Sequence, residues 1–223
     1  SYILEVYFNA TTITKIDYKD LPNVPHSFED ATFGSYQGRS VIISGHGSNG
    51  RCIEFDQEEY QVIPSLNVNR RLAASTFIQN KVAVAGGLND RYSSLDSIEI
   101  LDWDESNHGS QWIQSPSRLP INVSCHTLVT FNNKLYLIGG YNNWESIWEG
   151  RLDCIRNEIT WTLMEIKLQK KRIMRFSFVI SNKIIVFGGG PFHGSVYDDN
   201  DVVESIEGPD IQEGPNLKFR LSS

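Results

Sequence analysis

Few side chains in this sequence are spaced for catalysis or metal binding. The acidic run DDND at residues 198–201 lacks the glycine and the final glutamate of an EF-hand calcium loop, so we interpret it as a solvated loop. The five histidines, at positions 26, 46, 108, 126 and 193, show no metal-ligand spacing. No nucleophile elbow, phosphate-binding loop or zinc-protease motif occurs. We therefore expect no metal and no cofactor, and catalysis is not indicated.

Arginines and aromatic residues in two kinds of loop are better suited to binding a partner. Arg70 precedes Gly86 by 16 residues and Arg172 precedes Gly188 by the same interval, so the two arginines share a register. A single arginine is more often solvated or bonded to a structural neighbour, whereas a loop Trp beside a Tyr has the composition of an interaction hot spot. The candidate partner-binding residues are Arg70, Arg71, Arg91, Tyr92, Tyr141, Asn142, Trp144, Arg172, Arg175 and His193.

These loops connect an element that recurs along the chain. Residues 130–140 read TFNNKLYLIGG, and similar stretches, TFIQNKVAVAGG and FVISNKIIVFGG, end at Gly87 and Gly189. Each stretch has two runs of β-forming residues separated by a polar turn, which predicts a β-hairpin. A lysine always lies five residues before the first glycine, at positions 81, 134 and 183. A fourth, less similar copy is GSYQGRSVIISGHG, in which Gly45-His46 takes the place of the glycine pair.

The spacing of these hairpins predicts a repeat architecture. The first glycines fall at positions 45, 86, 139 and 188, so the intervals are 41, 53 and 49 residues. A second, less apolar hairpin follows each glycine pair, which makes four strands per repeat. Radially arranged four-stranded blades form a β-propeller. We expect the glycines to allow positive φ or close backbone approach, and a Trp of the fourth strand to pack between blades.

The pattern resembles the kelch repeat, in which a glycine pair is followed by a strand ending in Asp and then by a Trp. The matching positions are Gly86-Gly87, Asp102 and Trp112; Gly139-Gly140, Asp153 and Trp161; and, more weakly, Gly45, Asp56 and Tyr60. The fourth repeat keeps only Gly188-Gly189. The resemblance implies an all-β, kelch-type propeller of four-stranded antiparallel blades in one domain.

We expect this propeller to be incomplete, with about four and a half blades. The expected boundaries are residues 1–26 for the outer half of a blade, then 27–70, 71–122, 123–172 and 173–219 for four blades. Residues 219–223 look like the beginning of another first strand. We therefore expect the chain to be an excerpt of a longer protein.

Charge and composition exclude several classes of partner. The formal net charge is −7 and the charged residues are dispersed, so we expect neither nucleic acid nor membrane as a partner. The longest apolar runs are far too short to cross a bilayer. The three cysteines show no CxxC or other metal spacing, and their odd number favours reduced thiols. We expect a cytoplasmic protein, with a secreted or extracellular one as the alternative.

The kelch resemblance implies a protein-interaction module. Many such propellers are the substrate-recognition part of BTB-containing adaptors of cullin-RING ubiquitin ligases, and others bind actin as scaffolds. In this strand order, the loops between second and third strands share one face with those between fourth and first strands. Arginines on that face suit an acidic or phosphorylated segment. The alternative is a kelch-like enzyme acting on carbohydrate, of oxidase or mutarotase type; the partner's identity, any BTB segment and the oligomeric state remain open.

Overall fold

The computed structural model describes residues 2–9, 12–20, 28–36, 39–55, 59–103, 111–171, 173–180, 182–190, 203–207 and 210–213. All regular secondary structure in these residues is β-strand. The strands are β1 (Tyr2–Asn9), β2 (Thr12–Asp20), β3 (Thr32–Tyr36), β4 (Arg39–Ile43), β5 (Cys52–Phe55), β6 (Tyr60–Ile63), β7 (Ala74–Ile78), β8 (Lys81–Ala85), β9 (Leu95–Asp102), β10 (Ile113–Val123), β11 (Thr127–Phe131), β12 (Lys134–Ile138), β13 (Ser146–Asp153), β14 (Glu158–Lys167), β15 (Ile173–Ile180), β16 (Lys183–Gly190), β17 (Val203–Glu207) and β18 (Asp210–Glu213).

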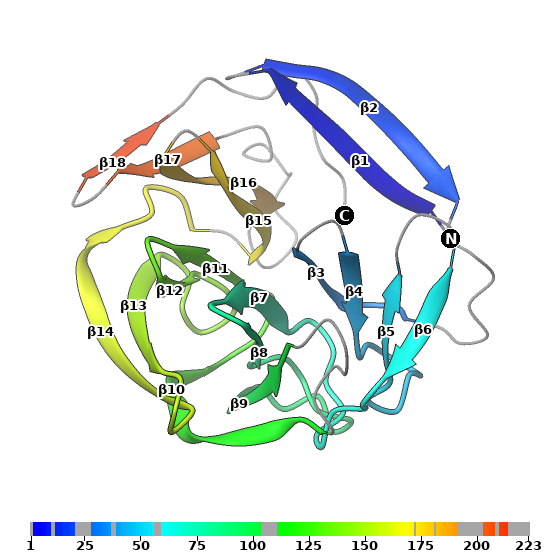
Figure 1. The fold of residues 1–223 in the computed structure, drawn as a ribbon. Coiled ribbons are helices and arrows are strands. Elements are labelled where there is room, and N and C mark those ends of the chain that lie inside the picture. The colour runs from blue at the N-terminus through cyan, green and yellow to red at the C-terminus, as the bar shows by residue number, and fades with distance from the viewer. Residues whose placement is uncertain are drawn as a thin grey trace.

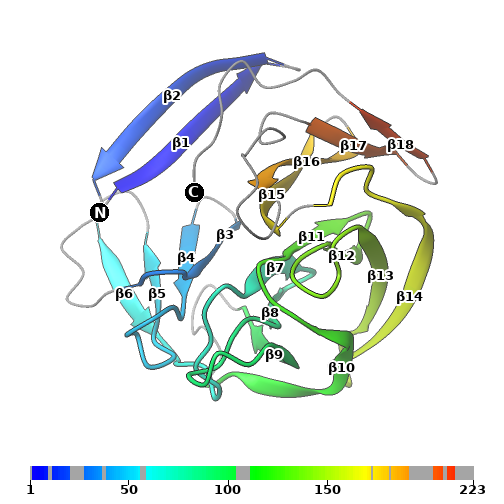
Figure 2. The same ribbon diagram turned by 180° about the vertical axis from the view of Figure 1, so that it is seen from behind.

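Four antiparallel sheets of four strands each follow one another along the chain. They are β3–β6, β7–β10, β11–β14 and β15–β18, here called the first to fourth blades, while β1 and β2 form a separate two-stranded sheet. The blades are arranged around a common centre, with their first strands innermost (Figures 1 and 2). Strand β7 lies against β3 and β11, and β11 lies against β15. The predicted all-β propeller architecture is confirmed.

The recurring turn lysine has a structural partner in each repeat. Lys81 is ion-paired with Asp102 and Lys183 with Glu207, in both cases across to the third strand of the same blade. In the third blade, Lys134 Nζ lies 2.8 Å from Glu149 Oε2. Opposite charges on neighbouring strands help to fix the register of a sheet. The lysine at the first turn therefore supports the hairpin and its third strand together.

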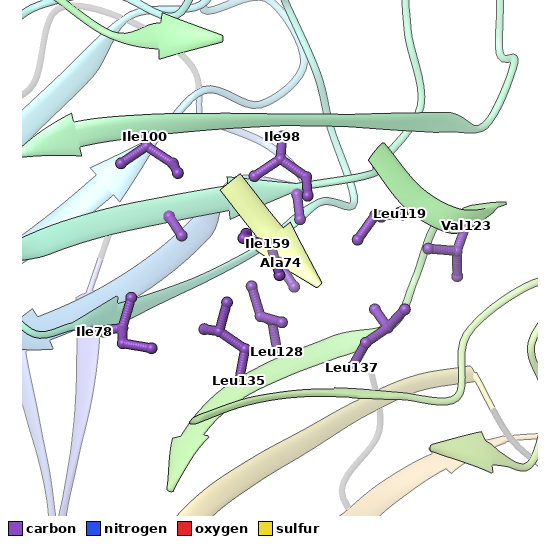
Figure 3. Close-up of a cluster of buried hydrophobic side chains, with 12 residues drawn as sticks. Ala74, Ile78, Ile98, Ile100, Leu119, Val123, Leu128, Leu135, Leu137 and Ile159 are labelled. Carbon is purple, nitrogen blue, oxygen red and sulfur yellow. The ribbon is translucent and has the colours of Figure 1, made fainter. Parts of the chain in front are cut away.

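Apolar side chains are buried mainly between neighbouring blades. One cluster combines residues from the second and third blades, including Ile98, Leu119, Leu135 and Ile159 (Figure 3). A second cluster joins the first and second blades and contains Trp112, which is 2% exposed. A third joins the third and fourth blades. The prediction that the repeat Trp packs between blades is confirmed, because Trp112 lies in the second blade and packs with core residues of the first.

The repeat glycines have the predicted backbone conformation. Gly86 and Gly87 have φ of 61° and 91°, and the pairs at positions 139–140 and 188–189 also have positive φ. A Cβ on Gly86 would lie 2.6 Å from the carbonyl oxygen of Val123, so close backbone approach also excludes a side chain. Both observations agree with the expected role of glycine.

The predicted alignment of the glycine pair in the first blade is wrong by one residue. His46 N donates to Glu29 O in the way that Leu88 N donates to Arg71 O, so Gly45 corresponds to Gly87. Ser44, with φ of 55°, takes the place of the first glycine. The sequence could not reveal this, because serine rarely adopts positive φ.

Candidate functional site

Two classes of loop meet on one face of the blades, as the sequence predicts. Isolated β-bridges join Glu29 to His46, Arg71 to Leu88 and Ser124 to Tyr141. In each case a residue just before a blade's first strand pairs with one in the loop after its second strand. The same contact recurs in three blades, so these loops form a continuous surface, here called the loop face.

Arg70 does not belong to the exposed surface, which corrects its prediction as a partner-binding residue. Its side chain is fully buried and its Nη2 lies 2.9 Å from Glu99 Oε1. Nη1 donates to the carbonyl oxygens of Gly86 and Ser97 at 2.9 and 3.0 Å. Burial lowers the pKa of the guanidinium, while the Glu99 charge opposes this effect. Arg70 is therefore a structural residue that ties the loop before β7 to the middle of its own blade.

Backbone and side-chain amides complete the surroundings of Glu99. Its Oε2 accepts hydrogen bonds from Asn67 N at 2.7 Å and Asn67 Nδ2 at 2.9 Å, and its Oε1 accepts one from Val68 N at 3.1 Å. A buried carboxylate needs such partners to offset its lost hydration. The buried pair of Arg70 and Glu99 is therefore part of a larger hydrogen-bonded network.

The fourth blade repeats part of this network. Glu204 is fully buried, and its Oε2 accepts a hydrogen bond from Gln169 N at 2.7 Å, just as Glu99 accepts one from Asn67 N. Arg172 itself lies outside the described residues.

A hollow of about 170 Å³ lies on the loop face between the first and second blades. It is lined by Gly45, His46, Asn69, Arg70, Arg71, Leu88, Asn89, Asp90 and Tyr92. Asn69 Nδ2 donates to Asp90 Oδ1 at 2.6 Å, so two of the lining side chains are bonded to each other. The hollow brings together the predicted candidates Arg71 and Tyr92 on one site.

Arg71 is held over the aromatic ring of Tyr92. Its guanidinium carbon lies 4.2 Å from the ring centroid, and Tyr92 is 68% exposed. Arg71 Nη1 lies 3.8 Å from Asp30 Oδ2, which is too long for a hydrogen bond. The guanidinium makes no hydrogen bond to any residue within the described ranges. Its N–H donors are therefore oriented by stacking but left for another acceptor.

The third blade adds an aromatic pair to the same face. The rings of Tyr141 and Trp144 are 5.6 Å apart and nearly perpendicular, an edge-to-face contact. Asn142 is exposed, with φ of 71°, and its Nδ2 reaches Asn122 O at 3.4 Å. Neighbouring Asn143 is buried instead and bonds Gly139 O and Ser146 O. The loop is thus fixed from inside, while its two aromatic residues are half-buried.

Hydrogen bonds connect this aromatic loop to the hollow. Asn122 Nδ2 donates to Ser94 O at 2.9 Å, and the hydroxyl oxygens of Ser94 and Ser124 are 3.3 Å apart. Asn122 also accepts the bond from Asn142, so it bridges the loops of the second and third blades. The loop face is therefore a braced surface over these two blades.

The remaining predicted residues, Arg91, Arg175 and His193, do not share one location. Arg91 is exposed in the loop after β8, where its backbone N donates to Asn89 Oδ1. Arg175 lies within β15 opposite Gly188 and not in a loop. His193 lies outside the described residues. The described part of the candidate surface therefore consists of Arg71, Arg91, Tyr92, Tyr141, Asn142 and Trp144.

Sequence and structure comparisons agree with this architecture. The family profile described as Kelch motif matches residues 123–155. The human protein named "Kelch repeat and BTB domain-containing protein 12" is 30% identical over 173 residues, which cover 69% of this chain and 26% of that protein. The chain belongs to the kelch-repeat β-propellers. A solved structure titled "Structure of YjhT" matches with a TM-score of 0.72 and 14% identity over 89% of this chain and 68% of that one, which supports the fold.

Kelch propellers typically bind proteins, and the loop face is consistent with that role. The chain spans about a quarter of the human relative's length. No group of three or more His, Cys, Asp or Glu side chains suited to a metal occurs among the residues that the structure describes. The same residues contain no helix long and apolar enough to cross a membrane.

Besides Leu88, sequence reasoning missed four polar side chains that line the hollow. They are His46, Asn69, Asn89 and Asp90. All four lie in the loop classes that were predicted to share a face, and His46 and Asn69 directly adjoin residues that were singled out. Only their position in these loops could have identified them, because polar residues of these types are common in any loop.

Proposed function

We propose that the loop face of this kelch propeller binds a segment of a partner protein. The observation that carries the proposal is the gathering of Tyr92, Tyr141 and Trp144 on a face whose loops are braced from beneath. Aromatic residues provide large contact areas with little conformational entropy to lose, and they dominate the energetics of protein interfaces. Interaction residues commonly lie in loops that a rigid scaffold positions.

The partner segment in this proposal is acidic or phosphorylated. Arg71 supports this assignment because its oriented N–H donors lack an acceptor among the described residues. Arg91, which adjoins Tyr92 in the chain, adds an exposed positive charge. Guanidinium groups bind carboxylates and phosphates through paired, charge-assisted hydrogen bonds. Arg70 is not part of this assignment, because its side chain is buried and both its Nη atoms donate inside the blade.

Selection of binding peptides from a random pool tests the proposal directly. Random peptides would be selected on the immobilised protein, and the dissociation constant of the strongest binder measured by fluorescence polarisation. Tyr92→Ala and Trp144→Ala should each weaken binding about tenfold or more, as expected for hot-spot residues. Ile155→Ala is the matched control, because Ile155 is 92% exposed in the turn between β13 and β14, on the opposite face. Unchanged binding in both loop-face variants, or loss in the control alone, would reject the proposal.

We also propose that the propeller is the substrate-recognition part of a BTB-kelch adaptor of a cullin-RING ubiquitin ligase that acts in the cytoplasm. The name of the human relative, which combines kelch repeats with a BTB domain, supports this assignment. Co-purification of a cullin with the full-length protein is the expected result. Co-sedimentation with filamentous actin, without a cullin, would instead favour the scaffold role.

A further inference from the structure

Arg71 and Asp30 form an ion pair that leaves the hydrogen-bonding groups of both side chains unused. They lie 3.8 Å apart, and their side chains are 19% and 30% exposed. Such an ion pair has Coulomb attraction but lacks the directional bonds that make Arg–carboxylate pairs strong. An incoming carboxylate could therefore gain hydrogen bonds that Asp30 does not make.

The main chain fixes Asp30 beside Arg71. Asp30 has φ of 58°, and its carbonyl oxygen accepts a hydrogen bond from Leu72 N at 2.8 Å. Arg71 is fixed in the same manner, because its N and O both bond to Leu88. These main-chain bonds place both residues at the contact between the first and second blades.

We propose that Asp30 is an internal competitor for the partner's carboxylate at Arg71. Resting on the proposed binding of an acidic segment, this assigns a function to the long ion pair: Asp30 neutralises Arg71 in the free protein without occupying its N–H donors. A partner's Glu or Asp takes those donors as a bidentate ligand in the hollow, with the Tyr92 ring holding the guanidinium plane. Asp30 thereby lowers affinity and favours partners whose carboxylate can reach both donors.

Two variants that each remove one negative charge separate this mechanism from general electrostatics. Asp30→Asn removes the competing charge, and asparagine tolerates the left-handed backbone conformation at this position. Asp90→Asn removes one negative charge from the wall of the same hollow, where its Oδ1 can still accept the bond from Asn69. Arg71→Gln removes the proposed ligand of the carboxylate.

The probe is a set of peptide pools, each with mixed residues on both sides of one fixed residue: Glu, Gln, Lys or phosphoserine. The wild-type protein should retain the Glu pool above the Gln and Lys pools, and Arg71→Gln should abolish this preference. For the best Glu peptide, Asp30→Asn should tighten binding about two- to fivefold, the range expected for one partly exposed charge pair, and Asp90→Asn should have a smaller effect. Higher retention of the phosphoserine pool would identify a phosphorylated residue as the ligand and replace the carboxylate.

Each of the following results would overturn the inference. Equal retention of the Glu and Gln pools would show that the hollow does not read a carboxylate. Equal tightening by Asp30→Asn and Asp90→Asn would show general electrostatics rather than competition at Arg71. Binding that depends on Trp144 but is insensitive to Arg71 and Asp30 would reject this inference and leave the proposed function standing, whereas no retention of any pool would reject both.

Discussion

Two neighbouring arginines in the loop before β7 have opposite environments. The Arg70 side chain is buried and its guanidinium donates to groups of its own blade, whereas Arg71 lies in the hollow with its donors available. Their residue types and local sequence are alike, so sequence alone could not distinguish them. The difference arises from Glu99, which lies 29 residues further along the chain and faces the one position but not the other.

Replacing Arg70 should destabilise the protein without acting through partner binding. Arg70→Met leaves the carboxylate of Glu99 buried without its charge partner, which costs about 3–5 kcal/mol. Urea denaturation would measure this loss. The double variant Arg70→Met, Glu99→Leu should recover much of the stability, because well-packed apolar residues often replace buried ion pairs without loss. The third blade supports this expectation, because it has two apolar residues in place of the ion pair. Val123 corresponds to Arg70, and Trp148 corresponds to Glu99.

A loss below about 1 kcal/mol for Arg70→Met would contradict the structural role of this arginine. If Arg70→Met abolished peptide binding with unchanged stability, Arg70 would be a partner-binding residue, as the sequence predicts.

The three cysteines should differ in reactivity according to burial. Cys52 is fully buried, and burial raises the pKa of its thiol to about 12. At pH 8 only about one thiol in ten thousand would then be ionised, and the thiolate is the reactive form. Cys125 is half-buried, with a pKa also raised by burial, while Cys154 is exposed. Titration with a disulfide reagent at pH 8 should modify Cys154 first and Cys52 only on unfolding. Rapid native reaction of all three would show that the first-blade core opens readily.

At the scale of elements, the hairpins were predictable because their signals are local. The polar turn, the alternating apolar runs and the lysine before each glycine pair all lie within one short stretch of chain. The register error in the first blade has a physical cause: Ser44 adopts a conformation that the sequence pattern reserves for glycine. The loop face was predictable from strand order alone. The hollow was not, because residues of the first and second blades, such as His46 and Asp90, line it together.

The glycine pair should be intolerant of side chains. Gly86→Ala combines positive φ with a Cβ only 2.6 Å from Val123 O and 2.8 Å from His126, so we expect a loss of about 2–4 kcal/mol. Gly34→Ala is the control: its nearest neighbour is the Phe77 ring at 3.0 Å, without positive φ. Thermal and urea denaturation of the two variants should therefore differ clearly. Equal losses would show that packing alone, and not backbone conformation, accounts for the glycine.

At the scale of the molecule, the apolar core of the described blades lies mainly between neighbouring blades. Each of the three apolar clusters draws on two neighbouring blades, as described above. Repeat proteins of this kind are stabilised by the individual repeats and by their nearest-neighbour interfaces. The same organisation explains why the loop face is braced: the blades that carry Tyr92 and Trp144 share the cluster drawn in Figure 3.

This organisation predicts that loss of one interface residue affects two blades more than the others. Trp112→Ala removes a side chain that is 2% exposed, packs with Val41 and Ile43, and donates from Nε1 to Pro64 O at 2.8 Å. We expect a loss of about 3–5 kcal/mol. Hydrogen-exchange mass spectrometry should show reduced protection in β4, β5, β8 and β9, with less change in the fourth blade. Trp161→Ala is the matched variant, because this Trp packs against the cluster between the second and third blades; its loss of protection should shift to those blades. A uniform loss over all four blades in both variants would mean that the propeller opens only as a whole, and nearest-neighbour stabilisation would then be rejected.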